Sequence, residues 1–210
     1  MTTNADTSFP PTLGVLLAGG RAERMGGGDK PLRMIGGETL LGRAAARLAP
    51  QCAGLVISAN GDPGRFSRFA LPVVADSATD SPGPLGGILA ALDWMAQHQP
   101  ELEWLVSAAA DCPFLPNNLV PHLHAACRAE GARLAMASSG GNTHPVNALW
   151  HVSLRDDLRA ALAGGHRKAH RFMREHGAAI AQWPAGPVDP FFNVNSPEDL
   201  AKAEQLATLE

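Results

Sequence analysis

Short apolar runs alternate with amphipathic segments along most of the chain. Apolar runs bounded by turn residues predict buried strands, and apolar residues spaced three and four apart predict helices. Strands are expected at 13–18, 54–60, at a run ending with 73–76, at 104–111 and near 132–138. Helices are expected at 39–49, at 84–98, near 116–130 and near 151–163.

This alternation of strand and helix predicts an α/β fold. We expect three α/β/α layers, with a mostly parallel, Rossmann-like sheet covered by helices on both faces. Ligands of such sheets bind beyond the carboxyl ends of the strands. Four of the expected strands end in polar or glycine residues, and these are Gly19-Gly20, Asn60, Asp76 and Asp111. A ligand site is therefore expected at that edge of the sheet.

Length and composition favour one globular domain. The 210 residues are 45% hydrophobic and 18% charged, which suits a single domain over residues 12–210 behind a disordered leader of residues 1–11. The net charge of -3 argues against nucleic acid or an anionic membrane as a partner, but a local basic loop still allows a small anionic substrate.

The lack of a recognisable targeting signal and the pattern of cysteines predict a cytoplasmic protein. The first residues, MTTNADTSFPPT, lack the basic and apolar regions of a signal peptide, and no apolar run approaches the roughly 18 residues of a membrane span. The three scattered cysteines fit neither a disulfide framework nor a metal knuckle. We expect a cytoplasmic protein with reduced thiols.

The stretch LLAGGRAERMGGGDKPL, residues 16–32, has the composition of a phosphate-binding loop. Its glycines allow backbone N–H groups to approach anionic oxygens, Arg24 offers a planar fork, and Lys30 offers a mobile point charge. The stretch lacks the Gly-Lys-Ser/Thr ending of a P-loop, and no helix can begin at GGGDKP as a dinucleotide fingerprint requires. A solvated surface loop is the alternative, and the preceding buried strand argues against it.

These residues resemble the signature loop of nucleotidyltransferases with the nucleotide-diphospho-sugar transferase fold. More narrowly, the chain resembles the molybdenum cofactor guanylyltransferases, because further matching motifs follow in the same order. These are VADS (74–77), PGPLGGI (82–88), ADCP (110–113), THPVNALW (143–150), FM (172–173) and FFNVNSPEDL (191–200). Two features depart from the pattern: Ala22 stands where many relatives have Ser, and three glycines occupy positions 26–28.

The resemblance implies a Mg²⁺-dependent transfer of GMP from GTP to the terminal phosphate of molybdopterin, with release of pyrophosphate. Other implied partners are chaperones that insert the cofactor, or molybdoenzymes, and a monomer is expected. The implied catalytic residues are Arg24, Lys30 and Asp111, with Asp111 as the metal ligand. The implied GTP-binding residues are Leu17, Ala18, Gly19, Gly20, Lys30, Asn60, Asp76 and Asp111. The implied molybdopterin-binding residues are His144, Asn147, Asn193 and Asn195.

Simpler roles remain open for several of these residues. Asp111 could cap a helix or form a turn before Pro113, Asp76 and Asn60 could be turn or loop residues, and His144 could be structural. In NVNSPEDL, alternation places Asn193 and Asn195 on one face, and Ser196 has the position of a helix N-cap.

Three other functions also remain as alternatives. They are a cytidylyltransferase of the same cofactor, a sugar-phosphate nucleotidyltransferase, and a nucleotide-binding scaffold. Guanine is favoured because this chain reads LAGG at 17–20, where the related cytidylyltransferases read LAAG. The second Gly, Gly19, leaves room for a purine.

Overall fold

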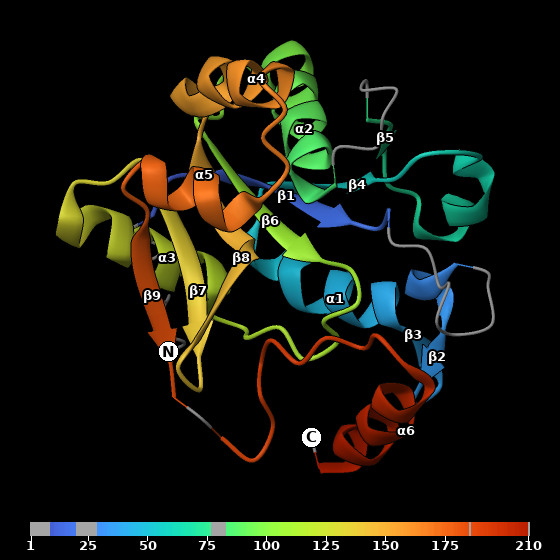
Figure 1. Ribbon diagram of the computed structural model, residues 1–210. Helices are drawn as coiled ribbons and strands as arrows, with labels where there is room; N and C mark the ends of the chain where they lie inside the picture. Colours follow the sequence, from blue (N-terminus) through green and yellow to red (C-terminus); the bar gives the residue numbers. More distant parts are fainter. Residues whose placement is uncertain (1–8, 20–28, 77–82, 185, 210) are drawn as a thin grey trace, which may run out of the picture.

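The computed structural model describes residues 9–19, 29–76, 83–184 and 186–209. Its centre is a seven-stranded sheet with the strand order β5-β4-β1-β6-β8-β7-β9 (Figure 1). All neighbouring strands pair in parallel except β8, which is antiparallel to both β6 and β7. The strands are β1 (Thr12–Leu17), β4 (Gly54–Ser58), β5 (Val73–Val74), β6 (Trp104–Ala109), β7 (Leu134–Ser139), β8 (Asn142–His151) and β9 (Ala179–Trp183).

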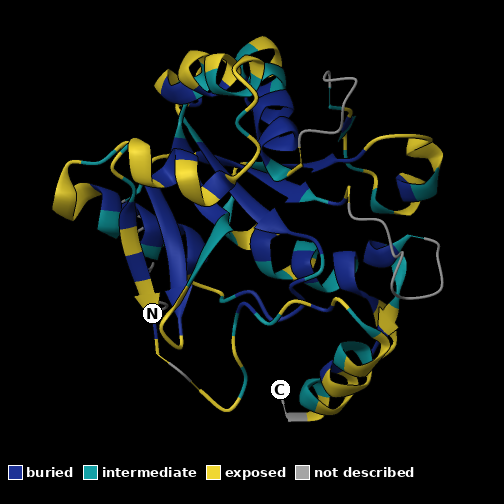
Figure 2. Cartoon of the chain, in the orientation of Figure 1, coloured by how far each residue is buried: buried dark blue, intermediate teal, exposed yellow. Residues whose placement is uncertain are grey.

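Helices cover both faces of the sheet, so the expected three-layer α/β/α fold is confirmed. The helices are α1 (Leu40–Leu48), α2 (Pro84–His98), α3 (Leu119–Glu130), α4 (Arg155–Ala163), α5 (Ala169–Glu175) and α6 (Pro197–Leu206). Side chains of α1 and α3 share one apolar core with one face of the sheet, and those of α2, α4 and α5 share a second core with the other face. Figure 2 shows the buried strands between these layers.

A third, smaller apolar core lies outside the central sheet and joins a short hairpin to the last helix, α6. The hairpin of β2 (Met34–Ile35) and β3 (Glu38–Thr39) packs against α6 through a small apolar cluster. The backbone N–H of Gly36 in the turn donates to both carboxylate oxygens of Glu204, at 3.1 and 3.0 Å. The carboxyl-terminal helix therefore supports the segment that follows Lys30.

The expected elements are confirmed, with α2 at the predicted bounds and the others within a few residues. Apart from the 3-10 turns, the elements without a prediction are the hairpin strands β2 and β3, helix α5, and strands β8 and β9, whereas α6 begins at the predicted Ser196 cap. Strand β8 is the largest difference, because it returns antiparallel between two strands of the otherwise parallel sheet.

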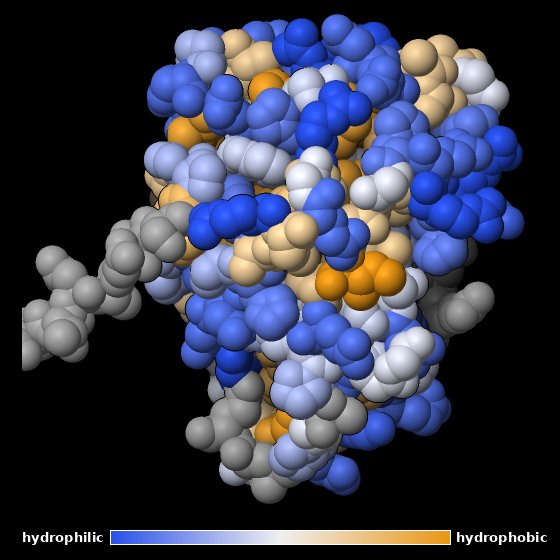
Figure 3. Space-filling model, turned by 90° about the vertical axis from the view of Figure 1, so that its left-hand side faces the viewer, coloured by the Kyte–Doolittle hydropathy of each residue, from blue (hydrophilic) through white to orange (hydrophobic). Residues whose placement is uncertain are grey.

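The surface is mainly hydrophilic on the side shown in Figure 3, where apolar residues form small separate patches. Among the large apolar side chains of the described residues, Met34 and Ile180 are about half exposed. No helix in the described part of the chain is long and apolar enough to cross a membrane.

The start of the described chain packs against the core at His124 of α3. Phe9 stacks on the His124 ring with centroids 5.5 Å apart, so at least residue 9 of the expected leader has a defined contact. Thr12 Oγ1 donates to the Pro10 carbonyl at 2.8 Å, and it therefore accepts the hydrogen bond from His124 Nε2, also at 2.8 Å. This arrangement assigns a proton to Nε2 of the imidazole.

His124 is expected to make the fold acid-sensitive. Burial, and secondarily the charge of Arg128, lower the pKa of His124 from 6.5 to about 4. Because the unfolded chain binds this proton more readily, His124 reduces stability progressively as the pH falls from 6.5 toward about 4. Urea unfolding of His124→Gln should depend less steeply on pH in this window than wild type, while His122→Gln on the same helix serves as control. An unchanged slope for His124→Gln would contradict the assignment.

Candidate functional site

A pocket of about 300 Å³ opens at the carboxyl ends of β1, β4 and β6. Gly19, Asn60, Asp76 and Asp111, four of the strand-end residues singled out from the sequence, all line it. The amino-terminal end of α2 also faces the pocket through Gly83, Pro84 and Gly87. The positive end of the helix dipole favours an anionic ligand there. Leu17, Ser58, Ala59, Ala109, Val146 and Asn193 complete the lining.

Lys30 lies at one side of this pocket in a cluster of oxygen atoms. Its Nζ lies 2.5 Å from Asp111 Oδ2 and donates to Asn195 Oδ1 at 2.6 Å and to Asn193 Oδ1 at 3.3 Å. The side chain is largely buried. Parallel pairing of β1 with β6 brings the two segments together, because Lys30 follows β1 through the loop and Asp111 follows β6 directly. The expected grouping of both asparagines on one face is confirmed.

A capping box at α6 holds Asn195 in position. Ser196 Oγ accepts from the Asp199 N–H at 3.1 Å, and an Asp199 carboxylate oxygen accepts from the backbone N–H groups of Asn195 and Ser196, each at 2.9 Å. These bonds, chiefly the one from Asn195, hold the pKa of Asp199 below its usual range. The predicted N-cap at Ser196 is confirmed, and it fixes the backbone that presents Asn195 to Lys30.

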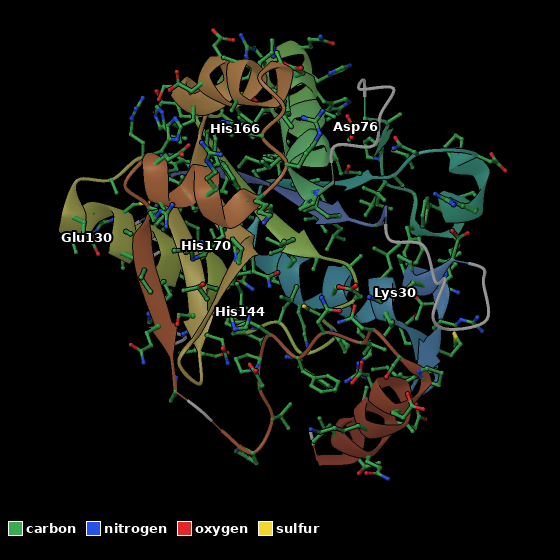
Figure 4. The ribbon with its side chains drawn as sticks, viewed as in Figure 1. Lys30, Asp76, Glu130, His144, His166 and His170 are labelled. Atoms are coloured by element: carbon green, nitrogen blue, oxygen red, sulfur yellow. The ribbon has the colours of Figure 1, made fainter. Side chains whose placement is uncertain are left out.

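Asn60 and Asp76 lie together on the opposite side of the pocket. Asn60 Oδ1 accepts from the Asp76 backbone N–H at 2.8 Å, which leaves the Asn60 Nδ2 as a donor. In Figure 4, Lys30 and Asp76 lie on either side of the end of β1. The pocket thus has Lys30 with Asp111 and two asparagines on one side, and Asp76 with Asn60 on the other.

The HPVN stretch forms an irregularity in β8 rather than a regular strand. The β7–β8 register shifts between Met136 and Ala137, where pairing passes from Ala148 to His144. Bulges of this kind redirect side chains next to binding sites, and here Val146 lines the pocket. Asn147 is buried; its Oδ1 accepts from the Ala109 N–H at 3.0 Å and its Nδ2 contacts Cys112 Sγ at 3.9 Å. Both ends of the Asn147 amide thus have partners inside the protein. Its contact with molybdopterin stays a prediction.

His144 lies on the same strand (Figure 4), and it is not among the residues that line the pocket. Ser139 Oγ donates to Asp189 Oδ1 at 2.7 Å and therefore accepts from His144 Nε2 at 2.8 Å. The ring stacks on Phe191 with centroids 4.8 Å apart. Burial lowers the pKa of His144, and the Asp189 charge partly opposes this shift. A role in molybdopterin binding stays a prediction for His144.

Part of the phosphate loop lies outside the described residues, and this includes Gly20, Arg24 and the glycines at 26–28. Of the other predicted loop residues, Leu17 and Gly19 line the pocket. Ala18 is buried and its N–H donates to the Ser58 carbonyl at 2.8 Å, which continues the β1–β4 ladder to the rim.

The Asp111 carboxylate suits a divalent cation. Its Oδ2 contacts Lys30, while its Oδ1 is buried and has no hydrogen-bond partner among the described residues. An unpartnered buried carboxylate oxygen is costly, and a hard cation would satisfy it. Across the described chain, no three His, Cys, Asp or Glu side chains lie close enough to form a protein-only metal cage. A cation at Asp111 would therefore take further oxygens from phosphate or water.

Two residues at the site were not among the predicted site residues: Gly87, which lines the pocket, and Arg65, which lies outside its lining. Gly87 allows α2 to approach the sheet closely, because a Cβ there would lie 2.4 Å from Ser58 Oγ. Arg65 donates to Asp29 Oδ1 and to the Asn60 carbonyl, both at 2.6 Å. Both contacts depend on how distant segments fold together, so neither spacing nor composition predicts them.

Comparison with known proteins places this geometry in a family. Residues 14–180 match the MobA-like NTP transferase domain. A Nitrobacter hamburgensis protein named molybdenum cofactor guanylyltransferase is 59% identical over 203 residues, which cover 96% of this chain and 97% of that protein.

Solved structures are similar in fold. A molybdopterin-guanine dinucleotide biosynthesis protein A from Archaeoglobus fulgidus superposes with a TM-score of 0.73 at 23% identity, covering 95% of this chain and 100% of that one. A 4-diphosphocytidyl-2C-methyl-D-erythritol synthase from Anaerococcus prevotii gives 0.70 at 11% identity, covering 95% and 96%. The fold is thus shared by enzymes whose names indicate different nucleotides.

Proposed function

The chain belongs to the molybdenum cofactor guanylyltransferases of the MobA-like NTP transferase family, and we propose that it transfers GMP from GTP to the terminal phosphate of molybdopterin. The observation that carries this proposal is the contact of Lys30 with Asp111, Asn193 and Asn195 beside a pocket at the strand ends. In this proposal, a cation, a carboxylate and two amides serve the two phosphate groups that react.

The reaction needs positioning and charge neutralisation more than acid–base chemistry. A molybdopterin phosphate oxygen, already anionic at neutral pH, attacks the α-phosphorus of GTP; the bond from that phosphorus to the bridging oxygen breaks, and pyrophosphate leaves with the electron pair. Lys30 neutralises phosphate charge, and in the same proposal Arg24 opposes the triphosphate from the loop. Asn193 and Asn195 orient Lys30 through their amide oxygens, and their amide N–H groups would serve the acceptor phosphate.

Mg²⁺ is the cofactor we propose, held at Asp111. When bound, it supplies Lewis-acid neutralisation of the triphosphate. The unpartnered Asp111 Oδ1 supports this assignment. The amino-terminal end of α2 would add a fixed positive potential on the other side of the pocket.

The base and ribose are proposed to lie between Gly19, Asn60 and Asp76. We also propose a cytoplasmic monomer that passes its product to chaperones or molybdoenzymes. The free thiols of Cys52, Cys112 and Cys127 support the reducing compartment.

The test is incubation of the enzyme with molybdopterin, Mg²⁺ and each nucleoside triphosphate in turn, following pyrophosphate release. Of the nucleoside triphosphates, only GTP should support turnover. Turnover with CTP and not GTP would indicate a cytidylyltransferase, and turnover with none of them would indicate a nucleotide-binding scaffold. Turnover only with a sugar phosphate as acceptor would indicate a sugar-phosphate nucleotidyltransferase.

Gly19→Ala tests the choice of base. Among the described residues, no heavy atom lies within 4 Å of a Cβ built at Gly19, so the variant should fold with unchanged stability while the new methyl group projects beside the pocket. We expect the preference for GTP over CTP, measured as a ratio of kcat/KM values, to fall about tenfold, the scale of a methyl group in a specificity pocket. An unchanged ratio would remove Gly19 as the residue that selects guanine.

A further inference from the structure

We propose that Arg65 is a positioning residue of the nucleotide site, which holds the Lys30 end of the phosphate loop at a set distance from the base side of the pocket. The inference rests on the proposed function and deepens it. It concerns a side chain outside the pocket lining, so Arg65 acts through its neighbours and not by contact with substrate.

The Arg65 guanidinium joins two segments that are distant in the sequence. Arg65 lies on the 3-10 turn Pro63–Phe69 that follows β4. One terminal nitrogen donates to Asp29 Oδ1 and the other to the Asn60 carbonyl, both at 2.6 Å. The group also lies over the ring of Phe66, 4.7 Å from its centroid. Two hydrogen bonds and a stacked ring hold its plane in one orientation.

Each partner of Arg65 leads directly to one side of the pocket. Asp29 is the N-cap of the 3-10 turn that begins with Lys30, whose Nζ contacts Asp111. Asn60 lines the pocket and its side chain accepts from the Asp76 N–H. Arg65 therefore connects the segment that carries Lys30 to the segment that carries Asn60.

Arg65 also neutralises a charge in an unfavourable place. Asp29 immediately precedes Lys30, so its carboxylate would repel an incoming triphosphate. The ion pair with Arg65 offsets that charge and holds the Asp29 carboxylate against the 3-10 turn Pro63–Phe69.

The contacts of Arg65 contribute to the site more than to stability. The Arg65 and Asp29 side chains are 27% and 31% exposed, and ion pairs at such exposure contribute little to folding. In addition, Arg65 Nε is buried without a hydrogen-bond partner among the described residues, which opposes folding. Removing the side chain should therefore weaken nucleotide binding and leave the unfolding temperature nearly unchanged.

The experiment compares Arg65→Ala with Arg68→Ala in the full-length enzyme. Arg68 lies on the same 3-10 turn and pairs with Glu38 of the hairpin, so it matches Arg65 in charge and location without spanning the pocket. The readouts are the Kd of the triphosphate by calorimetry, its KM, the KM of molybdopterin and the unfolding temperature. Measurements use whichever triphosphate binds wild type most tightly, so that failure of the guanine assignment does not decide this test.

For Arg65→Ala we expect the triphosphate Kd and KM to rise about tenfold, with the molybdopterin KM and the unfolding temperature unchanged. Millimolar guanidinium should restore part of the binding. Arg65→Lys should resemble Arg65→Ala, because one ammonium cannot replace the planar fork between both acceptors. Asp29→Asn combined with Arg65→Ala should cost no more than the larger single change, since the two residues act as one unit.

Three results would overturn the inference. The first is equal triphosphate affinity for Arg65→Ala and Arg68→Ala. The second is a parallel loss of unfolding temperature and of both KM values, which would indicate a structural role only. The third is full recovery in Arg65→Lys, because charge alone would then explain the effect.

Discussion

Replacing Asp111 with asparagine is expected to lower kcat about 10³-fold, which corresponds to losing several kcal/mol of transition-state stabilisation. The amide side chain has nearly the same shape as the carboxylate and could still accept from Lys30, but it lacks the charge that holds a divalent cation. The oxygen expected to bind the cation is Oδ1, which has no hydrogen-bond partner among the described residues. Pyrophosphate release measures the rate, and the stabilisation of the enzyme by GTP with and without Mg²⁺ measures the metal dependence of binding.

The control for Asp111→Asn is Asp93→Asn. Asp93 lies on α2 and pairs with Arg159 at 2.7 Å, outside the pocket lining. This variant removes a carboxylate of the same type and should keep full activity. Full activity in Asp111→Asn would remove the proposed metal site, and so would GTP binding that remains as dependent on Mg²⁺ as in wild type.

Replacing Lys30 with glutamine is expected to lower kcat/KM about 100-fold or more, the scale seen when one charge-stabilising donor is lost. Lys30→Arg should recover little of this activity. The three oxygens around Nζ lie at 2.5, 2.6 and 3.3 Å and converge on one point, which suits an ammonium and not a planar guanidinium. Steady-state kinetics of pyrophosphate release measures both variants.

Stability has to be followed in the Lys30 variants, because Asp111 loses its ionic partner in Lys30→Gln and its carboxylate is only 17% exposed. The unfolding temperature separates this effect from loss of catalysis. Lys202→Gln on α6 is the matched control: Lys202 is exposed, lies over the ring of Phe192 and does not contact the pocket. Wild-type activity in a folded Lys30→Gln protein would contradict the proposed role of Lys30.

Local chemistry explains which parts of the fold the sequence predicts well. The bounds of α2 follow from Pro84 in the first turn and from apolar residues at helical spacing. The N-cap of α6 follows from Ser196, Pro197 and the acidic residues after them. Strand β1 follows from one buried apolar run. Each of these signals lies within a few residues of the element that it predicts.

Strand β8 is an element that local sequence signals do not predict. Pro145 and polar residues interrupt its first half, and the strand bulges against β7, so its pattern is neither alternating nor continuously apolar. Its antiparallel direction follows from pairing with β6 and β7, which local periodicity does not encode. The short, alternating β9 is equally ambiguous from the sequence.

For the site, the sequence by itself determined the chemical groups and the edge of the sheet where they gather. Gly19, Asn60, Asp76 and Asp111 each follow the end of a strand by two residues, and parallel strands bring such ends to one edge. The motifs likewise determined the family. Only the tertiary structure decided the partners: that Lys30 meets Asp111 with Asn193 and Asn195, that Asn147 is used inside the protein, and that Arg65 joins Asp29 to Asn60. The physical reason is that these contacts join segments far apart along the chain, and their distances follow from strand order and the packing of α6, which no local pattern contains.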